Sequence, residues 1–216
     1  MKYLLALIAI AVPLGLGACS EPAPRNRGIY MLMDTSGTYT QELAKAQQII
    51  SAVLARLNPG DSFAVARIDT GSFSEKDIVA KVTFDERPSV ANQQKRQFQE
   101  RIARFVKTVR PAAYTDITGG ILQASEYLNE KDPGAKVILV FSDLKEDIKK
   151  GYIRDLPLAL DRIEIVALNV TKLRSDNVDP REYLTRLEDW QRRVVQGGGA
   201  WRVINDLDRL DRIIRG

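Results

Sequence analysis

The sequence of 216 residues contains no histidine and a single cysteine, Cys19. Without histidine, a zinc hydrolase loses its most common ligand and a Ser–His–Asp hydrolase loses its general base. One cysteine allows no disulfide within the chain. The formal net charge is only +4, both signs are mixed, and there is no basic block with interleaved aromatic residues. The sequence therefore does not indicate a nucleic-acid-binding protein.

The amino terminus carries an apolar stretch over residues 3–16, interrupted by one proline and one glycine. It is too short for a membrane-spanning helix, which needs about 20 apolar residues, and is typical of a secretory signal. Residues 16–19, Leu-Gly-Ala-Cys, resemble the lipobox of bacterial lipoproteins, in which the cysteine becomes the lipidated first residue. The alternative is an ordinary signal peptide that is cut nearby.

The lipobox resemblance implies a signal peptide over residues 1–18, followed by the lipidated Cys19 and a short tether that ends at residue 27. The eight residues 20–27 span at most about 28 Å when fully extended, so the domain would sit close to the bilayer. Ser20 follows the cysteine, where an aspartate would resemble an inner-membrane retention signal. We therefore expect a bacterial envelope protein on the periplasmic face of the outer membrane.

From residue 28 onward, apolar runs of strand length alternate with segments of helical periodicity, which indicates an α/β fold with a parallel sheet covered on both faces. The link between the second and third strands is too short for a helical crossover, so we expect the third strand to run antiparallel at the sheet edge. The sequence predicts one doubly wound, mostly parallel six-stranded sheet in a single domain over residues 28–216. The predicted strands are 28–33, 62–68, 77–84, 136–141, 162–168 and 200–204, and the predicted helices begin near residues 40, 88, 118, 180 and 205.

Oxygen-bearing side chains follow two of these strands and precede one helix: Asp34, Ser36, Thr38, Thr115 and Asp143. In a parallel sheet, ligands bind at the carboxyl ends of the strands, and the strands before Asp34 and Asp143 are expected to be neighbours. Hydroxyls and carboxylates without imidazole or thiolate suit Mg²⁺ or Mn²⁺. Ser36 and Thr38 alternate with Asp34, and we expect Gly37 to permit the bend that gathers them.

These segments, Asp-Thr-Ser-Gly-Thr at residues 34–38, Thr-Asp-Ile at 115–117 and Ser-Asp at 142–143, resemble the metal-ion-dependent adhesion site of the von Willebrand factor type A domain. The resemblance covers residues 28–216. It implies that Ser36, Thr38 and Thr115 supply hydroxyl oxygens to the metal, and that Asp34 and Asp143 act directly or through waters. It also implies a non-enzymatic module whose protein partner supplies an Asp or Glu carboxylate to the metal.

Two positions depart from the family pattern. Thr38 stands where serine is most common, and Leu144 follows Asp143 where glycine is common. Each departure keeps the ligand types but changes the bulk and the backbone freedom near the metal. Among the neighbouring residues, we expect Asp116 to be a turn residue. Glu146 and Asp147 are expected on a solvated face, and Trp190 and Trp201 in the partial core.

Two alternatives remain. Haloacid dehalogenase-like phosphotransfer enzymes also place an aspartate nucleophile after the first strand and a Ser or Thr after a later one, as Asp34 and Ser142 are placed. Their general acid stands two residues on, where this chain has Ser36, and no acidic pair follows Leu168, where residues 169–171 are Asn-Val-Thr. The other alternative is a scaffold whose metal site is empty and which binds partners through its helices.

Overall fold

The computed structural model describes residues 26–37 and 39–205. Four features predicted above therefore lie outside the described residues: the signal peptide, the lipidation residue Cys19, the hydroxyl ligand Thr38 and the terminal helix. Within the described residues, no helix combines the length and the apolar character needed to cross a membrane.

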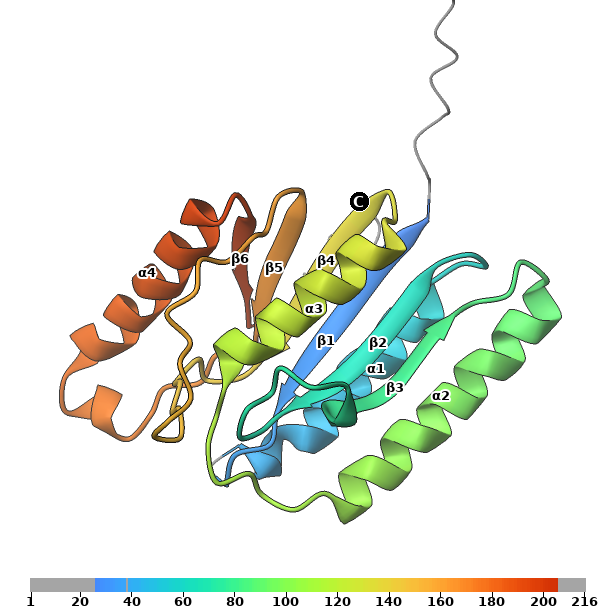
Figure 1. Cartoon of the computed structure of the whole chain (residues 1–216). Helices are drawn as coiled ribbons and strands as arrows, with labels where there is room; N and C mark the ends of the chain where they lie inside the picture. The colour runs from blue at the N-terminus through green and yellow to red at the C-terminus, as the bar shows by residue number, and fades with distance from the viewer. Residues whose placement is uncertain (1–25, 38, 206–216) are drawn as a thin grey trace, which may run out of the picture.

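A six-stranded sheet forms the centre of the molecule, with strand order β3-β2-β1-β4-β5-β6 (Figure 1). All neighbouring strands pair in parallel except β2 and β3, which are antiparallel. The predicted fold class, including the antiparallel edge strand, is confirmed. The strands are β1 (Arg27–Asp34), β2 (Ser62–Ile68), β3 (Ile78–Thr83), β4 (Ala135–Phe141), β5 (Ile163–Leu168) and β6 (Ala200–Ile204).

Helices cover both faces of the sheet. The residues of α1 (Leu43–Arg56) and α2 (Pro88–Thr108) pack into the core on one face, and those of α3 (Ile117–Lys131) and α4 (Pro180–Gln196) pack on the other. Figure 1 shows α3 crossing in front of the sheet, whereas α1 lies behind it. Helix α1 starts at Leu43, three residues after the predicted start at residue 40, because Thr40–Glu42 form a 3-10 turn before it.

The central strands are apolar because both of their faces are buried. Along β1, Ile29, Met31 and Met33 belong to the core cluster under α1 and α2, while Tyr30 and Leu32 belong to the cluster under α3 and α4. This continuous apolar character is expected of parallel strands covered on both sides. The carboxyl ends of β1 and β4 are thereby fixed side by side at one edge of the sheet.

The connection from β4 to β5 is irregular. Residues 144–162 contain no helix or strand, although they join two adjacent parallel strands. The segment runs past the start of α3, where the backbones of Thr115 and Asp147 exchange two hydrogen bonds. It also carries three exposed apolar side chains, Tyr152, Ile153 and Leu156.

Candidate metal centre

Asp34 is the last residue of β1, and its side chain is buried. One carboxylate oxygen, Oδ1, accepts a hydrogen bond from the backbone N–H of Ser36 at 2.8 Å. The other, Oδ2, accepts from the hydroxyl of Ser142 at 2.7 Å. Ser142 follows β4, so this bond ties the ends of the two central strands together. Both of these donors are neutral groups, so neither of them neutralises the charge of the carboxylate.

Asp143, the residue after Ser142, is 4% exposed. Its Oδ1 accepts from the backbone N–H of Lys145 at 2.9 Å. Burial raises the pKa of Asp143 above its ordinary value, and the negative charge of Asp34 raises it further, against the opposing effect of the Lys145 hydrogen bond. Two carboxylates thus lie close together at the carboxyl edge of the sheet. In the part of the chain that the structure describes, neither forms an ion pair.

The loop that follows β1 lies against the loop that precedes α3. The backbone N–H of Ala112 donates to the carbonyl of Thr35 at 2.8 Å, and Ser36 and Ala112 form a parallel bridge. Three residues later, Thr115 is 5% exposed, and none of the described residues forms a hydrogen bond with its hydroxyl. The structure therefore brings the backbone segments of Asp34, Ser36, Thr115 and Asp143 to one edge of the sheet.

The backbone at Gly37 does not need the conformational freedom of glycine. The described residues contain four glycines with positive φ, and Gly37 is not one of them. A Cβ atom at Gly37 would meet only the Pro111 Cβ, at 4.0 Å, which is ordinary van der Waals contact. Neither backbone conformation nor space therefore requires glycine at this position.

Leu144, next to Asp143, has the unusual backbone. Its φ is 65°, in the left-handed region that favours glycine. Its N–H donates to the Ser142 hydroxyl at 3.0 Å, and its carbonyl accepts from the indole N–H of Trp190 at 3.0 Å. Its side chain is buried in the core beneath α4. Hydrogen bonding and burial together hold a turn that glycine would adopt without strain.

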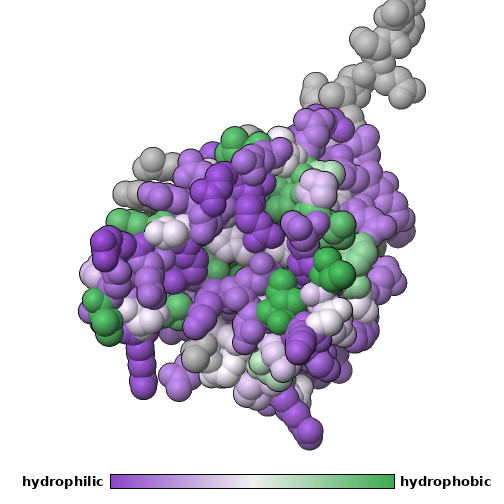
Figure 2. Space-filling model, turned by 60° about the vertical axis from the view of Figure 1, so that its left-hand side comes forward, coloured by the Kyte–Doolittle hydropathy of each residue, from purple (hydrophilic) through white to green (hydrophobic). Residues whose placement is uncertain are grey.

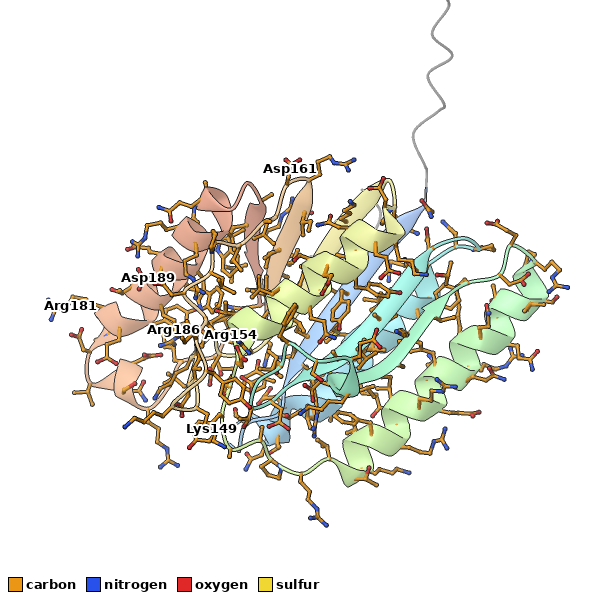
Figure 3. The ribbon with its side chains drawn as sticks, viewed as in Figure 1. Lys149, Arg154, Asp161, Arg181, Arg186 and Asp189 are labelled. Atoms are coloured by element: carbon orange, nitrogen blue, oxygen red, sulfur yellow. The ribbon has the colours of Figure 1, made fainter. Side chains whose placement is uncertain are left out.

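Arg186 of α4 also holds this turn. Its Nε donates to the carbonyl of Asp143 at 3.0 Å, and its guanidinium forms an ion pair with the buried Asp176 at 2.8 Å. Figure 3 shows Arg186 lying on the inner side of α4, whereas Arg181 extends away from the molecule. The sequence does not predict this contact, because α4 lies more than 30 residues beyond β4 along the chain.

Asp116 is more than a turn residue. It caps the start of α3 by accepting from the backbone N–H of Gly119 at 2.8 Å, and it also accepts from the N–H of Ser72 at 3.1 Å. Arg154, in the irregular connection, forms an ion pair with it at 2.6 Å. Because these donors hold both of its oxygens, Asp116 supports the loop that carries Thr115 and is not placed to act as a free ligand.

The prediction for Glu146 was wrong. Its carboxylate accepts from the N–H of Thr118 at 2.6 Å and from the Thr118 hydroxyl at 3.0 Å, and it pairs with Arg193 at 3.3 Å. The first turn of a helix favours a carboxylate, because its N–H groups have no partners within the helix. Asp147 is exposed, as expected.

Tyr39 is a second residue that the sequence analysis missed. Its buried hydroxyl donates to the carbonyl of Asn169 at 2.5 Å and accepts from the Asn169 side-chain amide at 2.8 Å. Burial raises the pKa of Tyr39 above its ordinary value. Its ring packs edge-on against Phe141, the last residue of β4, with centroids 5.1 Å apart. Tyr39 therefore joins the loop after β1 to the ends of β4 and β5.

The donor set at this edge is chemically suited to a divalent cation. It consists of carboxylate and hydroxyl oxygens, the ligands that Mg²⁺ and Mn²⁺ prefer. Two buried carboxylates that form no ion pair within the described residues are costly to hold in the charged state, and a bound cation would offset this cost. Among residues 26–37 and 39–205, no three acidic or cysteine side chains gather to form a carboxylate-rich or thiolate site, so hydroxyl ligands would be required.

No protein-family model and no curated protein matches this sequence. The structure is similar to a von Willebrand factor type A protein from Catenulispora acidiphila, with a TM-score of 0.52 and 13% identity over 89% of this chain and 42% of that one. The fold is that of the von Willebrand factor type A domain. The pilus adhesin SpaC from Lactobacillus rhamnosus GG, in its open conformation, shares this type A fold, with a TM-score of 0.52 and 10% identity over 88% of this chain and 29% of SpaC. This chain spans less than half the length of either protein.

Proposed function

We propose that this type A domain is a non-enzymatic, divalent-cation-dependent protein-binding module that is anchored in the bacterial envelope through a lipidated Cys19. The observation that supports it best is the pair of buried carboxylates, Asp34 and Asp143, which lie at the ends of adjacent strands and form no ion pair among residues 26–37 and 39–205. One of its structural neighbours is a pilus adhesin, and adhesion or assembly is the role that we extend to this chain.

In this proposal Ser36, Thr38 and Thr115 hold Mg²⁺ or Mn²⁺ through hydroxyl oxygens, and Asp34 and Asp143 hold it directly or through waters. The cation would supply a coordination position for an Asp or Glu carboxylate of the partner protein. Hydroxyl ligands leave the cation less neutralised than carboxylates would, so a partner carboxylate gains more from the bond. The Ser142 hydroxyl would keep Asp34 oriented by the hydrogen bond described above.

Calorimetric titration with Mg²⁺ and Mn²⁺ tests the metal site. We expect the wild-type protein to bind at least one of the two cations and Asp34→Ala to lose that binding, because the buried carboxylate is then gone. Asp147→Asn is the matched control, since it removes an exposed carboxylate from the same edge of the sheet. Metal affinity in the control should equal that of the wild type.

Two results would favour the alternatives. A folded wild-type protein that binds neither cation would support the scaffold, in which partners use the helix faces. Turnover of a phosphorylated substrate that is lost in Asp34→Asn would support the haloacid dehalogenase-like enzyme, because that enzyme requires Asp34 as a nucleophile. The dehalogenase-type metal ligands are expected after β5, where the structure places Asn169 in contact with Tyr39.

A further inference from the structure

Positive charge is concentrated in one segment of the chain. Residues 88–110, which comprise α2 and two following residues, contain six basic side chains and one acidic side chain, a net charge of +5. The whole chain has a net charge of +4, so the remainder has a net charge of −1. The mixed charge inferred from the overall composition therefore describes the rest of the protein but not this segment.

Four of these basic residues form what we call the basic strip: Arg101, Arg104, Lys107 and Arg110. They recur every three residues along the second half of α2 and into the loop beyond it, and all four are exposed. Within the described residues, none of the four forms an ion pair.

The basic strip ends at the candidate metal centre. Arg110 stands two residues before Ala112, whose N–H bonds to the carbonyl of Thr35 at 2.8 Å. At its other end, Arg101 and Arg104 line a shallow hollow of about 370 Å³ against β3, together with Lys76. Figure 1 shows α2 running along the β3 side of the sheet toward the edge at which β1 ends.

We propose that the basic strip binds an acidic segment of the partner protein, beside the carboxylate that the partner gives to the metal. This inference rests on the proposed function, which includes a partner protein that gives a carboxylate to the metal. It adds one property of that partner: several Asp or Glu residues must lie on one side of the metal-bound carboxylate. A protein partner is favoured over an anionic lipid surface because the strip leads to the carboxyl edge of the sheet. The chain enters β1 at the opposite edge.

The face seen in Figure 2 offers no comparable apolar docking surface. Its hydrophobic residues form small groups that hydrophilic residues separate. A large contiguous apolar patch is the usual mark of a protein-binding surface that relies on burial. Recognition through charge is consistent with this arrangement.

Two fluorescent peptides test the proposal, with the full chain carrying Cys19→Ser as the protein and Mg²⁺ present. One peptide has a single central aspartate flanked by serines, and in the other glutamates replace the serines. At low ionic strength, we expect the glutamate peptide to bind about tenfold more tightly, because several exposed charge pairs each contribute modestly. High salt should remove most of this advantage.

The triple variant Arg101→Gln, Arg104→Gln, Lys107→Gln should lose the advantage of the glutamate peptide and still bind the serine peptide as the wild type does. The control removes three exposed basic side chains from elsewhere, two of which form ion pairs: Lys131→Gln, Arg162→Gln and Arg202→Gln. The control should keep the tenfold preference. An unchanged preference in the first variant would overturn the proposal.

Two further outcomes separate the possibilities. Vesicles of phosphatidylglycerol that bind the wild type but not the first variant, with no preference between the peptides, would overturn the proposal in favour of a lipid surface. Binding of the glutamate peptide that depends on the strip but not on Mg²⁺ or Asp34 would support the strip and contradict the metal-dependent function. Failure of the metal centre and failure of the strip are therefore distinguishable.

Discussion

Leu144, next to the candidate metal centre, has a backbone conformation that favours glycine. A non-glycine residue with φ near 65° costs about 1 kcal/mol relative to glycine, whereas truncation of a buried leucine costs about 2–5 kcal/mol. Both Leu144→Gly and Leu144→Ala should therefore destabilise the protein. We expect Leu144→Gly to destabilise the protein by about 1 kcal/mol less than Leu144→Ala does. At most positions glycine is the more destabilising of these two replacements.

Urea unfolding monitored by circular dichroism measures this difference. The exposed Val178, which has no left-handed backbone, is a suitable control position, where both substitutions should change stability by less than about 1 kcal/mol. Equal stability of the two Leu144 variants would show that the turn stores no strain.

Asp143 leads to a second prediction for a single residue, which concerns the pH dependence of stability. Its pKa is raised in the folded protein by burial and by Asp34, so the folded state holds that proton more strongly than the unfolded chain does. In EDTA, wild-type stability should therefore fall as the pH rises from the ordinary value of 3.8 through the raised value. The Asp143→Asn variant should lack the part of this loss of stability that comes from Asp143. The variant should also be more stable than the wild type at neutral pH without metal.

The same substitution should abolish stabilisation by Mg²⁺. A ligand at 100 times its dissociation constant stabilises a protein by about 2.7 kcal/mol, so Mg²⁺ should raise the unfolding temperature of the wild type but not of Asp143→Asn. Thermal unfolding with and without Mg²⁺ measures both effects. A variant that is less stable than the wild type in EDTA would contradict the account of the buried carboxylate pair.

At the scale of elements, the irregular connection from β4 to β5 depends on one buried ion pair. Arg154 and Asp116 have side chains that are 14% and 1% exposed. Removing one partner of such a pair leaves an uncompensated charge, and Arg154→Met should destabilise the protein by about 3 kcal/mol. Arg181→Met, which breaks the exposed pair with Asp179, should leave the stability close to that of the wild type.

Urea unfolding compares the two variants, and limited proteolysis should cleave Arg154→Met within residues 144–162 sooner than the control. Figure 3 shows why the two arginines differ, since Arg154 points into the molecule and Arg181 points out of it. Similar stability of the two variants would indicate that backbone contacts alone hold the connection.

The elements differ in how far the sequence predicted them. The strands β2 and β6 have the predicted bounds, because turn residues stand directly before and after each strand: Asp61 and Asp69 for β2, and Gly199 and Asn205 for β6. The candidate site could be placed at the ends of β1 and β4 from the alternation of strands and helices alone. The roles of Glu146 and Arg154 could not be predicted, because they lie in a segment without periodicity and their partners are the first turn of α3 and its N-cap residue.

At the scale of the whole molecule, the proposed anchor makes a direct prediction. In a bacterial host, the wild-type protein should sediment with membranes and partition into detergent, because a diacyl anchor buries many methylene groups. A chain without residues 1–19 should be recovered in the soluble fraction with an unchanged Mg²⁺ affinity. Recovery of the variant with membranes would show that attachment comes from another part of the protein.

The direction of β1 determines how such an anchored protein would stand. Arg27 begins the strand and Asp34 ends it, so one rigid element of about 26 Å separates the membrane-proximal end from the carboxylates. With a short tether and β1 pointing away from the membrane, the binding edge would lie some tens of ångströms above the lipid headgroups. It could then engage molecules that approach from the aqueous compartment and would be out of reach of those embedded in the same bilayer.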